Sequence, residues 1–216
     1  MSLTVAALWR YPVKTLAGES IEVAELTTDG IVGDRVVHVR GPEGVRTSRR
    51  FHRLLGLHAT LGPDGEPLVD GEPWTLPTVL QRVRDAAGPD AALARSDGQE
   101  RFDVLPLLVA TDGAVAQFGR DVRRLRPNIL IGGVDGMGEL DWPGAELHIG
   151  DVVIGLDSLR GRCPMTTVDP DTLVRDREVL TDIIRRFNGK LALNAEVIRP
   201  GTIHVGDAVH LLRPLG

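Results

Sequence analysis

The stretch Leu147-His148-Ile149-Gly150-Asp151-Val152-Val153 contains two short apolar segments separated by a Gly-Asp pair. Apolar segments on both sides of a two-residue turn that contains glycine predict a β-hairpin. A similar stretch, Ile203-His204-Val205-Gly206-Asp207-Ala208-Val209, lies near the end of the chain and predicts a second hairpin. Two such hairpins favour a β-barrel over a parallel sheet.

The second strand of the first hairpin leads directly to Cys163, the single cysteine of the chain. This strand is predicted over residues 152–159, and Arg160 and Arg162 follow it. Positive charge beside a thiol favours the thiolate, which attacks electrophiles and binds soft metals. A free cysteine is more often a small buried apolar residue, but flanking arginines and a polar turn are not typical of a core position. The sequence therefore singles out Cys163 as a functional residue at a strand end.

The first part of the chain contains short strand-like runs separated by frequent turn signals. The predicted strands include residues 4–9, 21–26, 36–39, 54–61 and 67–69. This spacing is typical of a compact antiparallel β-unit. Residues 77–87 predict a short helix, and the small, polar residues 89–101 predict a linker. We therefore predict a mostly β protein with a few helices, in which an N-terminal β-barrel-like unit (residues 1–88) precedes a second β-barrel domain (residues 89–216).

The second part of the chain adds strands and two helices. Strands are predicted over residues 104–110, 128–131 and 191–199. Thr111 and Asp112 predict the N-terminal cap of a helix over residues 114–125. Residues 176–188 predict an amphipathic helix that ends at Gly189.

Composition and length limit the classes of function. The chain has 216 residues and a net charge of −5, and one cysteine cannot form an internal disulfide. No apolar run approaches the roughly 20 residues of a membrane span, and the N-terminus lacks the layout of a signal peptide. These features predict a cytoplasmic protein. The acidic balance gives no support to a nucleic-acid or membrane-surface partner.

Several cations occupy predicted strand ends or constrained turns. They are Lys14, Arg35, Arg126, Arg160 and Arg162. In an acidic protein this placement favours local recognition of phosphate or carboxylate groups. For any one of them, solvated surface charge is the simpler interpretation.

A separate basic run contains Arg46, Arg49, Arg50, His52 and Arg53. We interpret it as a solvated edge strand, with a docking patch for an acidic partner as the alternative. The chain has no haem-attachment or nucleotide-binding motif, and one cysteine cannot hold an iron–sulfur cluster. If Cys163 supports redox chemistry, the electrons must come from another protein.

Five motifs, in this order, resemble those of the MOSC proteins. They are Tyr11-Pro12-Val13-Lys14, Gly33-Asp34-Arg35, Arg126-Pro127-Asn128, Arg162-Cys163 with the Thr166–Thr172 segment, and Gly201-Thr202-Ile203 with Val205-Gly206-Asp207. The most similar branch includes the mitochondrial amidoxime-reducing component. The resemblance spans nearly the whole chain, with an N-terminal β-barrel unit followed by the MOSC domain.

This resemblance implies a molybdenum cofactor, Mo-molybdopterin, with the Cys163 thiolate as metal ligand and catalytic residue. The family positions that hold the cofactor phosphate match Lys14, Thr15 and Arg35. The family positions that contact the pterin match Asp103, Arg126, Asn128 and Arg162. The implied reaction is the two-electron reduction of N-hydroxylated compounds, with oxygen leaving as water. Electrons would come from a separate ferredoxin- or cytochrome-type carrier.

The chain departs from the family pattern at four positions. Family members often carry hydroxyl residues where this chain has Val104, Leu105 and Gly161, and a tyrosine where it has His210. These departures leave fewer hydrogen-bond donors for the pterin. Two alternatives stay open at this point. One is a non-redox cofactor-binding or sulfur-carrier module with a persulfide on Cys163, and the other is a structural relative in which Cys163 is merely buried.

Overall fold

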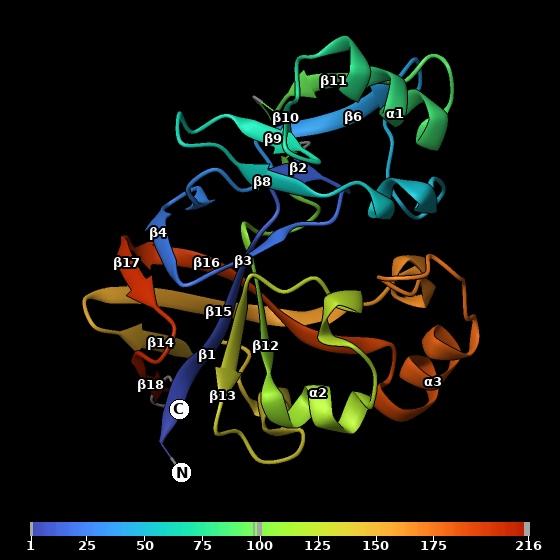
Figure 1. Ribbon diagram of the computed structural model, residues 1–216. Helices are drawn as coiled ribbons and strands as arrows, with labels where there is room; N and C mark the ends of the chain where they lie inside the picture. The colour runs from blue at the N-terminus through green and yellow to red at the C-terminus, as the bar shows by residue number, and fades with distance from the viewer. Residues whose placement is uncertain (1, 97, 99–100, 214–216) are drawn as a thin grey trace.

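The computed structural model describes residues 2–96, 98 and 101–213. Figure 1 shows a larger β-barrel flanked by helices α2 and α3, and a smaller unit that carries α1. Strand β1 (Leu3–Arg10) runs from the barrel toward the smaller unit. The prediction of a mostly β protein with a few helices, built from an N-terminal β unit and a β-barrel, is confirmed.

Among the described residues, seven strands close into a barrel in the order β13-β12-β16-β15-β14-β18-β1, and β1 pairs back to β13. After β1, their bounds are β12 Leu107–Thr111, β13 Ile129–Gly132, β14 Glu146–Ile149, β15 Val152–Gly161, β16 Lys190–Arg199 and β18 Ala208–Leu212. Strand β3 (Glu19–Ile21) extends this sheet beside β1. The first strand of the chain therefore completes a barrel whose other strands come from the second half.

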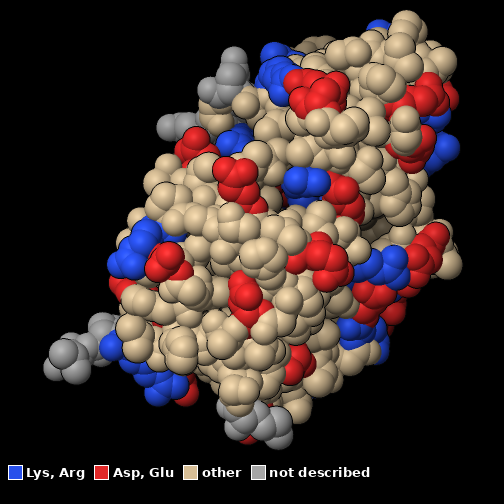
Figure 2. Space-filling view, turned by 60° about the vertical axis from the view of Figure 1, so that its left-hand side comes forward, with Lys and Arg blue, Asp and Glu red and all other residues tan. Residues whose placement is uncertain are grey.

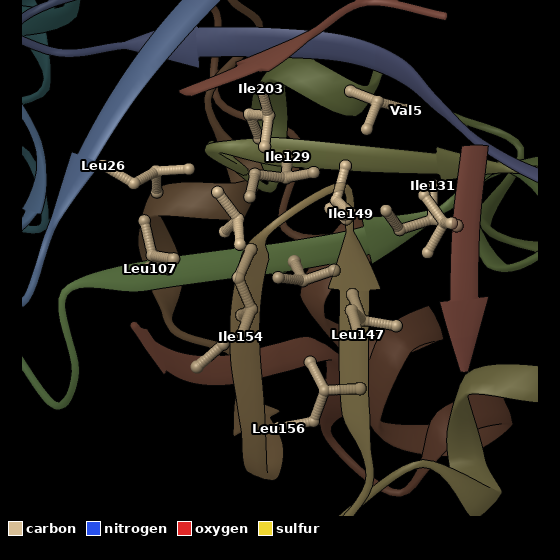
Figure 3. Close-up of a cluster of buried hydrophobic side chains, with 14 of the residues drawn as sticks. Val5, Leu26, Leu107, Ile129, Ile131, Leu147, Ile149, Ile154, Leu156 and Ile203 are labelled. Carbon is tan, nitrogen blue, oxygen red and sulfur yellow. The ribbon is translucent and has the colours of Figure 1, made fainter. Parts of the chain in front are cut away.

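Aliphatic side chains fill the barrel interior. Strands bury alternate residues, so that Ile129 and Ile131 of β13 both point inward, as do Leu147 and Ile149 of β14. Figure 3 shows these side chains converging with those of neighbouring strands. Fully burying one such side chain stabilises the fold by about 1.5–3 kcal/mol. The interior is thus a packed core, and polar chemistry must lie at an end of the barrel or outside it.

The predicted hairpin around Gly150 is confirmed, because β14 and β15 pair antiparallel up to Ile149 and Val152. The second predicted hairpin is wrong. Strand β17 (Gly201–His204) pairs with β4 (Val23–Thr27), whereas β18 pairs with β14 and β1. The Gly-Asp segment between them instead contacts β1, where the Gly206 amide donates to the Val5 carbonyl at 2.8 Å. The same sequence pattern thus serves a crossing between two sheets.

The smaller unit contains two short sheets and α1 (Pro77–Ala87), whose bounds match the prediction. One sheet contains β2 Val13–Lys14, β6 Val37–Gly41, β7 Gly44–Val45 and β11 Ala92–Arg95. The other contains β8 Ala59–Leu61, β9 Pro67–Val69 and β10 Glu72–Pro73. Strand β5 (Gly30–Ile31) pairs with β4 in a further small sheet. The unit has its own apolar core, in which Val37 and Val39 of β6 pack with Val79 and Val83 of α1.

The predicted linker is wrong for residues 92–95, because these form β11 and pair with β6 from Ala92–Arg40 to Arg95–Val37. Residues 97, 99 and 100 of that segment lie outside the described residues. A strand after residue 88 therefore belongs to the sheet of the smaller unit, while β1 belongs to the barrel. The division into residues 1–88 and 89–216 stays a prediction.

Two other elements differ from the predictions. The helix expected over residues 114–125 is α2 (Asp112–Phe118), capped by Thr111 and ended by Gly119 in the left-handed conformation. The strand expected over residues 21–26 is divided between β3 and β4, which belong to different sheets. Helix α3 (Glu178–Phe187) lies where predicted, but Asn188 forms its C-terminal cap. The 3₁₀ helices are η1 His52–Gly56, η3 Val122–Arg124, η4 Gly138–Asp141 and η5 Pro164–Thr167.

A buried carboxylate joins η4 to the barrel. The Glu139 side chain accepts hydrogen bonds from the Thr111 amide (3.2 Å) and hydroxyl (2.9 Å) and from the Ala192 amide (2.7 Å). We expect Glu139→Ala to lower the free energy of unfolding by about 1–3 kcal/mol for each amide left without an acceptor. Urea unfolding measures this loss against Glu43→Ala, whose carboxylate is exposed. Equal losses in the two variants would contradict the anchoring role.

Candidate functional site

A polar cleft lies between the smaller unit and one end of the barrel. Strand β2 and the turns that follow β5 and β7 supply one wall, and the ends of β13 and β15 with the segment before β12 supply the other. All eight predicted site residues line this cleft: Lys14, Thr15, Arg35, Asp103, Arg126, Asn128, Arg162 and Cys163. The fold therefore brings together residues that are far apart in the sequence.

Cys163 lies just beyond β15 and caps the start of η5. Its carbonyl accepts hydrogen bonds from the Thr166 amide at 3.1 Å and the Thr166 hydroxyl at 2.9 Å. Pro164 follows directly, and its ring fixes its own backbone φ angle at the first position of η5. The cysteine is half-buried, and it lines the cleft. Cys163 is therefore not a buried core residue, which argues against the alternative of a structural relative in which it is merely buried.

The guanidinium of Arg162 forms a hydrogen bond to the protein through Nη2 but not through Nε. Its Nη2 donates to the Leu125 carbonyl at 2.7 Å, and its backbone amide donates to the Gly189 carbonyl at 2.8 Å. The Nε atom is buried and has no acceptor among the described residues. Burial lowers the pKa of Arg162 to about 10. A buried donor without an acceptor is rare in folded proteins, and it indicates a place for a ligand atom or a water.

Arg126 is a second cation with an incomplete set of partners. The residue is 8% exposed, and its guanidinium carbon lies 4.1 Å from the centroid of the Tyr11 ring. No described residue accepts a hydrogen bond from its guanidinium or forms an ion pair with it. Burial lowers the pKa of Arg126 to about 10. The stacking on Tyr11 offsets part of the cost of burying this charge.

Asp103 connects the two walls of the cleft. Its carboxylate lies 3.0 Å from Lys14 Nζ, 2.6 Å from Arg49 Nη2 and 3.2 Å from Arg160 Nη2. Burial alone would raise the pKa of Asp103, but these cations outweigh that effect and hold its pKa below the usual range. Among the described residues that line the cleft, the cations thus outnumber the one carboxylate, that of Asp103.

Three predicted site residues adopt a left-handed backbone conformation that side chains rarely take. They are Thr15 (φ 86°), Arg35 (φ 52°) and Arg126 (φ 57°). Each such conformation costs about 1–3 kcal/mol and persists only where the surroundings fix it. Arg35 is held by an ion pair with the buried Asp34, whose carboxylate also accepts from the Tyr11 amide at 2.7 Å. These strained conformations lower the stability of the fold, and the surrounding contacts hold the three residues in place at the cleft.

Asn128 has a structural task within the cleft wall. It is fully buried, its Oδ1 accepts from the Leu108 amide at 3.1 Å, and its Nδ2 donates to the Trp9 carbonyl at 3.4 Å. The same Oδ1 lies 3.4 Å from Arg35 Nη1. Asn128 therefore links β1, β12 and Arg35, and a direct contact with a ligand stays a prediction.

The cleft also contains Arg160, which the sequence analysis grouped with the anion-recognising cations without a cofactor role, and Arg49, which it placed in the basic run. Arg160 joins Asp103 to Asn194, whose Oδ1 accepts from Arg160 Nη1 at 3.2 Å. Arg49 reaches the cleft from the turn after β7. No local signal distinguishes Arg49 from its basic neighbours.

The basic run around Arg49 is a turn followed by η1, so the interpretation as an edge strand is wrong. Arg46 turns inward, where it pairs with Asp90 at 2.6 Å. Arg50 is exposed and lies 3.6 Å from Glu43. Arg53 is exposed as well. Arg49 is exposed too, but it lines the cleft, so Arg50 and Arg53 are the exposed arginines of the predicted docking patch that lie outside the cleft.

The four departures from the family pattern fall in two places. Val104, Leu105 and Gly161 line the cleft, and Val104 is 56% exposed. His210 lies on β18 opposite His148, and it is not among the described residues that line the cleft. The strand expected to start at residue 104 begins at Leu107, because the preceding residues bend along the cleft wall.

Outside the cleft, charge is mixed rather than gathered. On the face shown in Figure 2, acidic and basic side chains lie interspersed among uncharged residues. Within the described part of the chain, no helix combines the length and the apolar character needed to cross a membrane. The concentration of cations at the cleft is therefore a local feature of an acidic protein.

Comparison with known proteins agrees with this architecture. The profile of the MOSC N-terminal beta barrel domain matches residues 2–87, and that of the MOSC domain matches residues 111–210. The chain is 28% identical to mitochondrial amidoxime-reducing component 1 of Homo sapiens, over 97% of this chain and 83% of that protein. It is 30% identical to component 2 of Homo sapiens, over 96% and 83%.

The fold is also similar to that of the YuaD protein from Bacillus subtilis. The two structures superpose with a TM-score of 0.56 at 11% sequence identity, over 100% of this chain and 98% of the other. At this level of identity the likeness concerns the fold alone. Together with the two domain matches, these relationships show that the chain belongs to the MOSC-domain family whose members carry the MOSC N-terminal β-barrel domain.

Proposed function

We propose that this protein is a molybdenum-cofactor-dependent oxidoreductase that reduces N-hydroxylated compounds. The observation that carries the proposal is the position of Cys163, which places the single thiol of the chain in a cleft lined by cations. The relatives named as amidoxime-reducing components support the reaction class, since an amidoxime is an N-hydroxylated compound.

The residues of the cleft fit such a cofactor. A phosphate needs cations and hydrogen-bond donors, and the cleft offers Lys14, Thr15 and Arg35. The pterin has hydrogen-bond acceptors, and the buried Nε of Arg162 has no acceptor among the described residues. A soft metal prefers a thiolate ligand, which Cys163 can supply. Thr15 and Arg35 adopt a strained backbone conformation at the cleft. Core packing does not explain this strain, whereas a role in binding a ligand does.

We assign the residues as follows. Lys14, Thr15 and Arg35 would hold the phosphate, and Asp103, Arg126, Asn128 and Arg162 would hold the pterin. Cys163 would ligate molybdenum. When bound, the cofactor supplies the two-electron reduction chemistry. The chain itself orients the cofactor through these contacts, and Arg49 and Arg160 fix Asp103 in place.

An external electron donor completes the proposal, because the sequence carries no flavin, haem or iron–sulfur motif. We expect the purified, cofactor-loaded protein to be inert toward benzamidoxime with NADPH alone. Addition of a ferredoxin- or cytochrome-type carrier with its reductase should start turnover, measured as benzamidine formed. Steady turnover with NADPH as the sole reductant would contradict the requirement for a carrier.

The exposed Arg50 and Arg53 are our candidates for the docking of an acidic carrier. Attraction between opposite charges speeds encounter and weakens with salt. Arg50→Glu with Arg53→Glu should therefore lower the carrier-dependent rate at low ionic strength and reduce its salt dependence. Arg185→Glu, a change at another basic position on α3, serves as the control. If the double variant and the Arg185→Glu control had equal carrier-dependent rates at low ionic strength, this patch would be excluded as the docking site.

A further inference from the structure

Two arginines of the Cys163 cleft hold neither the phosphate nor the pterin in the proposed assignment. Six cations line the cleft among the described residues, and four of them are assigned to the cofactor. The other two are Arg49, in the turn after β7, and Arg160, near the end of β15. Their side chains meet at the carboxylate of Asp103, at 2.6 Å and 3.2 Å. These two arginines are therefore available for a ligand other than the cofactor.

The contacts that the two arginines make leave hydrogen-bond donors over, because a guanidinium carries five N–H groups. Arg49 donates to Asp103 through Nη2, and Arg160 donates to Asp103 through Nη2 and to Asn194 through Nη1. No described residue accepts from Nε or Nη1 of Arg49, whose side chain is 48% exposed. Lys14 shares the Asp103 carboxylate, so one negative charge faces three cations. An anion that enters the cleft thus meets free, partly exposed donors.

The space beside Arg160 is open and partly apolar. Gly161 follows Arg160, and a Cβ atom added at Gly161 would meet no atom within 4 Å apart from its chain neighbours. Val104, which lines the same cleft, is 56% exposed. Arg160 stands three residues before Cys163, so the two Cα atoms are at most about 11 Å apart. A ligand with a flat apolar body can therefore lie near Cys163 and still reach Arg160.

We propose that the substrates of this cleft are N-hydroxylated compounds with a carboxylate on a flat apolar body, and that Arg49 and Arg160 bind the carboxylate. The fork of an arginine fits a carboxylate, and hydrogen bonds between charged groups are stronger than those between neutral groups. The inference rests on the proposed function, because it names the substrate class of the proposed reduction. In that reduction the N–O bond breaks, and two electrons from the carrier with two protons leave an N–H group and one water. The carboxylate takes no part in this step.

The test compares benzamidoxime with its 3- and 4-carboxylates, and with the 4-carboxamide, which matches the 4-carboxylate in size but has no charge. Without an electron donor the cofactor-loaded protein binds these compounds without reducing them, so calorimetry measures each affinity. We expect at least one carboxylate to bind about tenfold more tightly than both neutral compounds. The preference should weaken with salt, because the Arg49 side chain is 48% exposed. With carrier and reductase present, the same preference should appear in KM.

Arginine variants assign the preference to its residues. Arg49→Met with Arg160→Met should abolish it, whereas Arg185→Met removes a charge from an exposed position of α3 outside the cleft and should preserve it. Each preference is a ratio within one protein, so it does not depend on the fraction that is folded or loaded. Arg49→Met alone should lower the preference, and this variant provides the test if the double variant does not fold.

The inference is overturned if neither carboxylate binds more tightly than benzamidoxime. It is equally overturned if the arginine variants keep the full preference. If the carboxylates bind preferentially through both arginines but no compound is reduced, the recognition of the anion stands and the proposed reaction is wrong.

Discussion

Cys163→Ser is expected to reduce the rate of benzamidoxime reduction to that of a protein-free control. The physical reason is that serine replaces a soft thiolate by a hard hydroxyl that stays protonated near neutral pH, which is a poor ligand for molybdenum. The fold should persist, because Cys163 is half-buried at the start of η5 and its hydrogen bonds to Thr166 use the backbone carbonyl. The measurement is turnover with carrier and reductase in excess.

Circular dichroism and thermal unfolding of the serine variant provide the control for folding. Thr181→Ala, a small change at a half-buried position of α3, is the control for the effects of making and purifying a variant. If the serine variant turned over at the wild-type rate, the thiolate would not be the metal ligand, and the assignment of Cys163 would be wrong.

Replacing both Lys14 and Arg35 by alanine is expected to strip the cofactor from the purified protein. Each charge-assisted hydrogen bond to an anion contributes about 1.5–3 kcal/mol, so the loss of both should weaken binding by about 10² to 10⁴-fold. The readout is molybdenum per protein chain, measured after gel filtration. Because Asp34 is fully buried beside Arg35, an unfolding curve must accompany the measurement.

Two further variants make that result specific. Arg50→Ala with Arg53→Ala removes the same amount of positive charge from exposed positions outside the cleft, and should leave occupancy unchanged. Lys14→Arg keeps the charge and should retain part of the cofactor. Wild-type molybdenum content in the Lys14 and Arg35 double variant would remove both residues from the phosphate site.

The sequence predicts the barrel because its strands alternate and its turns contain glycine, and these are local features. It does not predict which strands pair. The segment after Gly201 has the same pattern as the hairpin at Gly150, but β17 pairs with β4 from the other end of the chain. Likewise, the small residues before Arg95 look like a linker and yet form an edge strand on β6. Such pairings depend on contacts that are distant in sequence.

In the candidate site too, local features could be predicted from the sequence, whereas contacts between distant segments could not. Cys163 and its flanking arginines are recognisable because unusual residue types stand side by side. The roles of Asp103 and Arg49 depend on a meeting of segments that lie 54 residues apart. The left-handed conformations of Thr15, Arg35 and Arg126 have no signature in these residue types, since glycine or asparagine would be expected there. These features become visible only in three dimensions.

The central claim is that this cleft holds a molybdenum cofactor through Cys163. The most direct measurement is the content of molybdenum, pterin and thiol-bound sulfur in the protein purified from a molybdenum-replete host. Our account predicts about one molybdenum and one pterin per chain in the wild-type protein, because the cofactor would be tightly bound. It predicts that Cys163→Ser loses the metal. Bound sulfur without metal would instead favour the persulfide carrier. Wild-type protein that carries neither molybdenum nor pterin would contradict the claim.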